Sequence, residues 1–106
     1  MLDVYLGLDS LTYDKDVERR ELYGKAGAFR PKEYGVEYRV LSNAWLISPL
    51  LMGRVYDITV LTTDIYRQGA RLPREMCEAA AQCINTSDES TAAEILQQAK
   101  TMFGLE

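Results

Sequence analysis

The chain has 106 residues, of which 47% are hydrophobic and 26% charged, a composition typical of one folded domain. Its formal net charge is −4, which argues against direct nucleic-acid binding because that function needs a positive surface. The sequence contains no histidine, which excludes Ser-His-Asp and Cys-His catalysis and most zinc sites. No apolar run approaches the roughly 18 residues of a membrane helix, and the N-terminus lacks a signal-peptide pattern. We therefore expect a cytoplasmic protein with no membrane partner.

The first third of the chain predicts a short helix followed by charged and flexible segments. Apolar residues at positions 2, 5, 6, 8 and 11 have helical spacing, with an interruption at Gly7. A densely charged stretch covers residues 14–21, and five basic residues but one acid lie between Arg19 and Lys32. The glycines within residues 24–27 indicate a flexible loop.

Two short strands at residues 28–31 and 36–41 predict a hairpin, joined by a turn at residues 32–35. Because side chains alternate along a strand, Glu37, Arg39 and Leu41 are expected on one face of the second strand. A two-stranded hairpin is marginally stable alone, so it must pack against something else.

After Ser42 the apolar period becomes helical. A stripe from Ile47 to Tyr66 predicts one long helix, with Ser48–Pro49 as its start and Gly69 as its stop. Further helices are expected from Pro73 and from the capping box at Thr91–Glu94, separated by a loop at residues 85–90. The predicted fold is α+β: a short antiparallel hairpin packed on a long helix, followed by two C-terminal helices. Residues 1–106 form one small domain in this interpretation.

The strongest chemical pattern is the pair Glu37 and Arg39, two positions apart on one strand face. A carboxylate is a hard ligand suited to Mg²⁺, and a guanidinium binds a carboxylate or phosphate through two parallel hydrogen bonds. Arg30 on the partner strand and Lys25 in the glycine loop could add positive charge beside them. The same pattern is also typical of a cross-strand ion-pair ladder on a solvated sheet face.

Seven tyrosines in a chain of this size are typical of a protein interface, because each offers an apolar ring and a polar tip. They also fit half-buried surface positions. The candidates for partner binding are Tyr23, Tyr34, Tyr56 and Tyr66.

The run RRELYGKAGAFRPKEYGVEYR (residues 19–39), followed by Leu41–Trp45, resembles the C-terminal portion of the phage amidoligase-type, or COOH–NH2 ligase-type, proteins. The resemblance covers residues 2–66, so the chain divides into a ligase-like fragment (1–68) and a helical extension (69–106). This family is related to glutamine synthetase and glutamate–cysteine ligases, which implies ATP-dependent ligation with Mg²⁺. By resemblance, Glu37 would be a metal ligand and Arg39 a substrate or phosphate contact, with Arg30 and Lys25 as further phosphate contacts.

The family's full enzymes are several hundred residues long, and one Glu and one Arg on a hairpin cannot hold several metal ions and two substrates. We therefore expect a catalytically incomplete module, not an enzyme by itself, which binds and inhibits a protein partner, as an anti-CRISPR-type phage protein acting on a host defence complex in the host cytoplasm. No cofactor is expected for the isolated chain. The alternative is part of an ATP- and Mg²⁺-dependent ligase, completed by another subunit or by further copies of this chain. A decayed gene product is the third interpretation.

Overall fold

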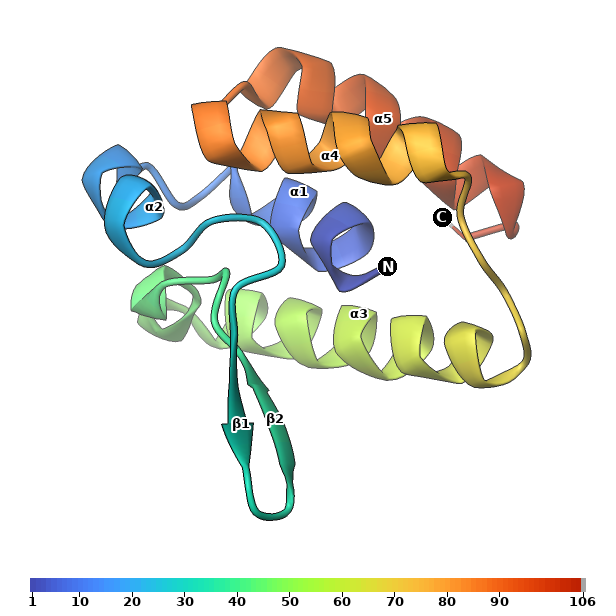
Figure 1. Cartoon of the computed structure of the whole chain (residues 1–106), viewed down its shortest axis with the longest axis horizontal. Helices are drawn as coiled ribbons and strands as arrows, with labels where there is room; N and C mark the ends of the chain where they lie inside the picture. The colour runs from blue at the N-terminus through green and yellow to red at the C-terminus, as the bar shows by residue number, and fades with distance from the viewer. Residues whose placement is uncertain (106) are drawn as a thin grey trace.

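The computed structural model describes residues 1–105 and arranges them in three layers (Figure 1). The N-terminal segment lies in the middle, α4 and α5 cover one side of it, and α3 lies on the other. In chain order the elements are η1 (Asp3–Gly7), α1 (Leu8–Ser10), α2 (Val17–Leu22), β1 (Phe29–Lys32), β2 (Gly35–Tyr38), η2 (Asn43–Ile47), α3 (Pro49–Arg67), α4 (Arg74–Thr86) and α5 (Glu89–Met102).

The N-terminal segment forms the centre of the core, since every residue from 4 to 11 is buried. A helix with apolar residues on all sides needs cover on all sides, and α3, α4 and α5 provide it. A Cβ atom at Gly7 would lie 2.8 Å from Cδ1 of Ile84, so the glycine lets α4 approach closely. The Tyr5 hydroxyl donates a 2.6 Å hydrogen bond to the carbonyl oxygen of Ala99, which joins the first helical turns to α5.

The start and end of α3 confirm the expectation from the sequence. The Ser48 hydroxyl accepts hydrogen bonds from the N–H groups of Leu50 and Leu51, and Pro49 occupies the first turn. Gly69 follows the helix with a φ of +98°, a conformation that favours glycine. Within α3 only Thr62 is fully buried, so the long helix is only partly covered by the rest of the chain.

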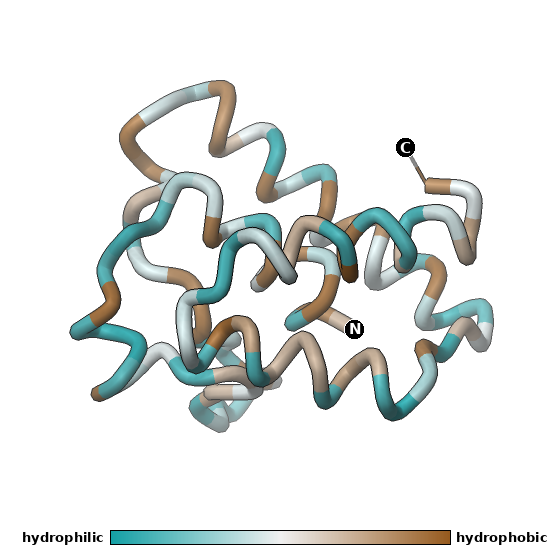
Figure 2. The backbone as a smooth tube through the Cα atoms, turned by 90° about the horizontal axis from the view of Figure 1, so that it is seen from above, coloured by the Kyte–Doolittle hydropathy of each residue, from teal (hydrophilic) through white to brown (hydrophobic). Residues whose placement is uncertain are grey.

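The two C-terminal helices form as expected, and most of their apolar residues at helical spacing are buried, including Ala80, Cys83 and Ile84. Ala79 and Met102, which the spacing also places on the inner sides, are exposed. In Figure 2, hydrophobic and hydrophilic positions alternate every few residues along the helices, as expected for helices with one buried side. The start of α5 differs from the prediction. Asp88, not Thr91, is the N-cap, because its carboxylate accepts the N–H of Thr91, and the predicted loop at residues 85–90 is correspondingly shorter.

The helix α2 was not expected, because its sequence is charged and has no apolar stripe. It begins where the Asp16 carboxylate accepts the N–H of Arg19. The η2 turn similarly begins at Ser42, whose hydroxyl accepts the N–H of Ala44. Both elements are therefore set by local capping rather than by apolar periodicity.

The hairpin pairs Phe29 with Tyr38 and Arg30 with Glu37 in antiparallel register, and the predicted α+β class is confirmed. Its contact with the long helix is more limited than expected, because the strands pack mainly on each other and the turn projects past α3 (Figure 1). Only the base approaches α3, where Phe29, Tyr38 and Tyr66 line one hollow. Both faces of the outer hairpin are therefore accessible.

Candidate functional site on the hairpin

One face of the hairpin carries three cations around a single carboxylate. Glu37 lies 3.4 Å from Nζ of Lys32, 3.8 Å from Nε of Arg39 and 3.9 Å from Nε of Arg30. The cross-strand pairing of Arg30 with Glu37 places these side chains together. The Arg39 N–H donates to the Ala28 carbonyl at 2.8 Å, which continues the ladder one step beyond β2. The face is therefore an ion-pair ladder with a net charge of +2.

This face does not fit a magnesium ion. Glu37 is the one carboxylate here, and three cations already contact it, so their positive charges oppose the approach of a divalent cation. Across residues 1–105, no group of three or more acidic, cysteine or histidine side chains is placed to hold a metal. Arg and Lys side chains with a surplus of positive charge instead suit a carboxylate or phosphate group.

Lys25 lies in the loop that leads into β1 and makes no ion pair with Glu37 in the described part of the chain. Backbone hydrogen bonds hold this loop against the core. The Ala26 N–H donates to Oδ1 of Asn85 at 2.8 Å, and the Gly27 N–H donates to Oδ1 of Asp3 at 3.1 Å. The structure therefore brings together Arg30, Glu37 and Arg39 of the predicted site, adds Lys32, and leaves Lys25 outside it.

Arg19 holds the segment that follows β2 in place, a role that the sequence did not reveal. Its guanidinium donates to the carbonyl oxygens of three consecutive residues at 2.9–3.0 Å, namely Arg39, Val40 and Leu41. A side chain at Gly24 would clash with this guanidinium and lie 3.0 Å from the carbonyl oxygen of Val40. Arg19 and Gly24 thus fix the base of the hairpin and, with it, the position of Arg39.

Arg20 is buried although it is charged. Its guanidinium donates to the Asp14 carbonyl and to the Ser87 hydroxyl, and lies 3.9 Å from Oδ1 of Asp14. Burial alone would raise the pKa of Asp14. Hydrogen bonds from Ser42 and from the Asp16 N–H, together with the charge of Arg20, hold this pKa below its ordinary value. The hydrogen bond from Arg20 to Ser87 ties α2 to the end of α4.

A sequence model of the family described as phage phiEco32-like COOH.NH2 ligase-type 2 matches residues 1–102. The chain belongs to this family. No curated protein and no solved structure matches it. The match extends beyond residues 2–66, the range of the resemblance noted from the sequence, and includes α4 and most of α5.

The four partner-binding candidates of this ligase-family chain are all exposed, and they are spread over three parts of the chain. Tyr34 is 90% exposed in the hairpin turn, and Tyr56 is 69% exposed on α3. Tyr23 follows α2, and Tyr66 lies near the end of α3, where the guanidinium of Arg71 is 3.8 Å from its ring centre. They do not form one patch, and of the four only Tyr34 lies in the outer hairpin.

The protein also contains a cavity of about 520 Å³ between α3 and the N-terminal segment, which the sequence did not predict. At its edge the Arg54 guanidinium pairs with the carboxylate of Asp9, which is buried on the central segment. Burial and the nearby charge of Asp9 raise the pKa of Tyr13 to about 12.

Between residues 1 and 105, no helix is both long and apolar enough to cross a bilayer.

Proposed function

We propose that this chain is a catalytically incomplete, ligase-derived module that binds a protein partner through its projecting hairpin. The observation that carries the proposal is the exposure of both hairpin faces. Phe29, Val36 and Tyr34 are 62%, 69% and 90% exposed, while the opposite face carries the three cations. A lone hairpin is only marginally stable, and exposed aromatic side chains gain free energy when a partner covers them.

The pairing of the carboxylate on the hairpin supports the non-catalytic part of the proposal, because three cations already contact Glu37. Phosphoryl transfer requires metal ions and several positioned cations, and the hairpin face offers one carboxylate that is already paired. The partner class that we propose is a host defence complex, which the chain would inhibit by occupying a functional surface. The net charge of −4 supports this choice, since an acidic protein can compete for a basic nucleic-acid channel.

The test is affinity capture of the tagged chain from host lysate that contains active defence complexes, with bound proteins identified and quantified by mass spectrometry. The informative variant is Tyr34→Ser with Val36→Ser, which removes apolar surface from the outer hairpin. Leu22→Ser on α2 is the matched control, because Leu22 is 66% exposed. The proposal predicts a stoichiometric partner that the hairpin variant loses and the control retains. Capture of no partner, or equal capture by both variants, would contradict it.

The alternative function is one part of a ligase that another polypeptide completes with Mg²⁺ and ATP. The net charge of +2 around Glu37 favours it, because Arg30, Lys32 and Arg39 suit a nucleotide phosphate or an acid substrate. Co-expression with the captured partner and assay of ATP hydrolysis with Glu37→Gln/Arg39→Gln would test it. Loss of ATP hydrolysis in this variant would support the ligase function, and retained capture with no hydrolysis would support the binding module.

Self-completion by a second copy is tested by the oligomeric state. On α3 the apolar residues Met52, Tyr56 and Val60 are four positions apart and 37–69% exposed, so this helix face is available for contact. Light scattering that gives the monomer mass at high concentration would argue against an active site shared between copies.

A further inference from the structure

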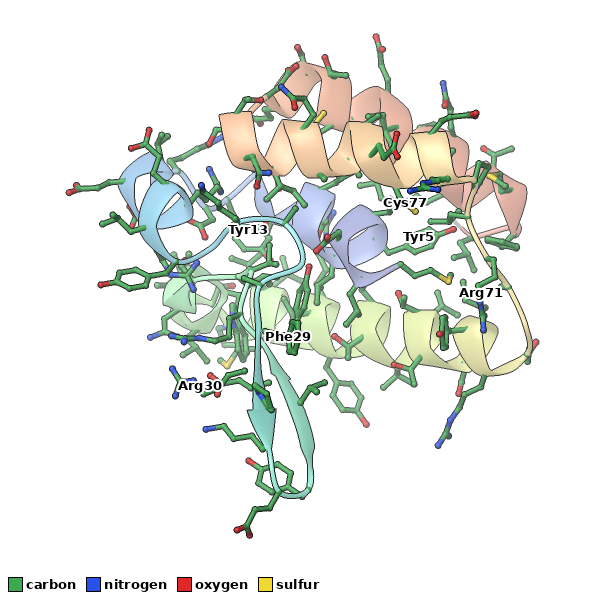
Figure 3. The ribbon with its side chains drawn as sticks, viewed as in Figure 1. Tyr5, Tyr13, Phe29, Arg30, Arg71 and Cys77 are labelled. Carbon is green, nitrogen blue, oxygen red and sulfur yellow. The ribbon has the colours of Figure 1, made fainter. Side chains whose placement is uncertain are left out.

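The base of the hairpin contains an open hollow of about 390 Å³, separate from the cationic face. Three elements each contribute one aromatic ring to its lining: Phe29 from β1, Tyr38 from β2 and Tyr66 from α3. Phe29 is 62% exposed and Tyr66 is 50% exposed, so their rings are accessible. Figure 3 shows Phe29 and Arg30 leaving adjacent positions of β1 toward different sides of the hairpin.

Asp3 places a carboxylate beside these rings. Its Oδ1 atom accepts hydrogen bonds from the Tyr38 hydroxyl at 2.5 Å and from the Gly27 N–H at 3.1 Å. Burial and the Asp3 charge raise the pKa of Tyr38, which keeps the phenol protonated as a donor. Oδ2 of Asp3 receives no hydrogen bond from any residue between 1 and 105, so one carboxylate oxygen is free to accept. The carboxylate of Asp3 is therefore held in a fixed orientation, and its Oδ2 atom can accept a hydrogen bond from a ligand.

Aromatic rings beside a carboxylate favour a cation, because the ring faces carry negative charge density and the carboxylate adds a full charge. The chain itself gives one example of such a contact. The guanidinium of Arg71 lies 3.8 Å from the centre of the Tyr66 ring, yet Arg71 is not part of the lining of the hollow. The net charge of −4 also favours approach of a basic surface.

We infer that this hollow binds an arginine or lysine side chain of the protein partner, between the rings of Phe29 and Tyr66 and against the carboxylate of Asp3. The inference rests on the proposed partner-binding function and states which kind of partner side chain the hollow binds. The outer hairpin would supply apolar contact, and the hollow would select a basic residue. The cationic face lies on a different side of the hairpin and would contact acidic groups of the same partner.

The test titrates n-butylguanidinium into ¹⁵N-labelled protein and follows the amide signals of Gly27, Phe29 and Tyr38 by NMR. The control ligand is n-butylurea, which has nearly the same shape and no charge. We expect saturable shifts with butylguanidinium and weaker binding of butylurea. Tyr66→Leu and Phe29→Leu should each weaken cation binding by about 2- to 5-fold, and Asp3→Asn by a similar factor. Tyr56→Leu on the same helix removes an exposed ring outside the hollow and should leave the affinity unchanged.

Equal affinity for butylurea and butylguanidinium would overturn the inference, and so would equal effects of Tyr66→Leu and Tyr56→Leu. Asp3 also contacts the loop and the hairpin, so Asp3→Asn could affect folding, whereas Tyr66→Leu changes an exposed side chain and keeps the test valid. The two proposals fail separately. Cation binding without a captured partner would refute the partner-binding function alone, and capture that depends on Tyr34 and Val36 without cation binding would refute this inference alone.

Discussion

Replacing Gly24 by alanine tests the structural role of residues 19–39, the segment that carries the family resemblance. The new Cβ would lie 3.0 Å from the Val40 carbonyl oxygen and 3.3 Å from Cζ of Arg19, so the guanidinium must move from its three carbonyl partners. Overpacking typically costs about 1–3 kcal/mol, and the lower entropy of the unfolded chain offsets about 0.4–1 kcal/mol of it. The net loss should be about 1–2 kcal/mol, which corresponds to a decrease in Tm of about 5–10 °C.

Thermal and urea denaturation followed by circular dichroism would measure this loss, with Gly53→Ala as the control. Gly53 lies inside α3 with no atom near a built Cβ, so alanine there should stabilise the protein by about 0.5–1 kcal/mol through helix propensity. A double-mutant cycle with Arg19→Ala separates the causes, because alanine at position 24 should cost much less once the guanidinium is gone. Additive effects of the two substitutions would refute the reasoning, as would a Gly24→Ala protein as stable as wild type.

Three further predictions concern charges. Glu37→Gln should raise the net charge of the hairpin face from +2 to +3, change the free energy of unfolding by less than about 1 kcal/mol, and strengthen pyrophosphate binding in calorimetry at low salt; unchanged binding would argue against an anion site. Arg54→Met should destabilise the protein by about 3 kcal/mol in urea denaturation, because the buried carboxylate of Asp9 loses its cation. Adding Asp9→Asn should then recover part of that loss, and no recovery would contradict the explanation. Because the folded-state pKa of Asp14 is lowered, its contribution to stability is present above its ordinary pKa of 3.8 and is lost as the pH falls below it; an Asp14→Asn variant should lose stability less steeply on acidification, which pH-dependent denaturation would show.

Periodicity predicted the helices well where one side of a helix faces the core. The stripe from Ile47 to Tyr66 and the cap at Ser48 placed α3 correctly, and most of the inner residues of α4 and α5 agree with the structure, although Ala79 and Met102 are exposed. The alternation of residues 36–39 placed Glu37 and Arg39 on the charged face, where the cross-strand ion pairs also form.

The sequence could not show contacts that depend on residues far apart in the chain. In the sequence Arg19 lies in a densely charged stretch, whereas its guanidinium donates to three carbonyl groups that are 20–22 residues further along the chain. Lys32 had no predicted role, although the diagonal neighbour on an antiparallel hairpin is a signal that could have placed it beside Glu37. The sequence also did not show that the hairpin packs little on α3, because strand patterns do not specify which surface a sheet face contacts.

The position of the N-terminal segment in the middle layer has a consequence for how the protein forms in the cell. The residues at the centre of the core are synthesised before the helices that enclose them, as the hydrogen bond between Tyr5 and Ala99 illustrates. A chain still lacking α5 exposes one side of this apolar segment to solvent. The core can therefore close only after α5 has been synthesised, and until then the nascent polypeptide exposes an apolar segment that chaperones would recognise.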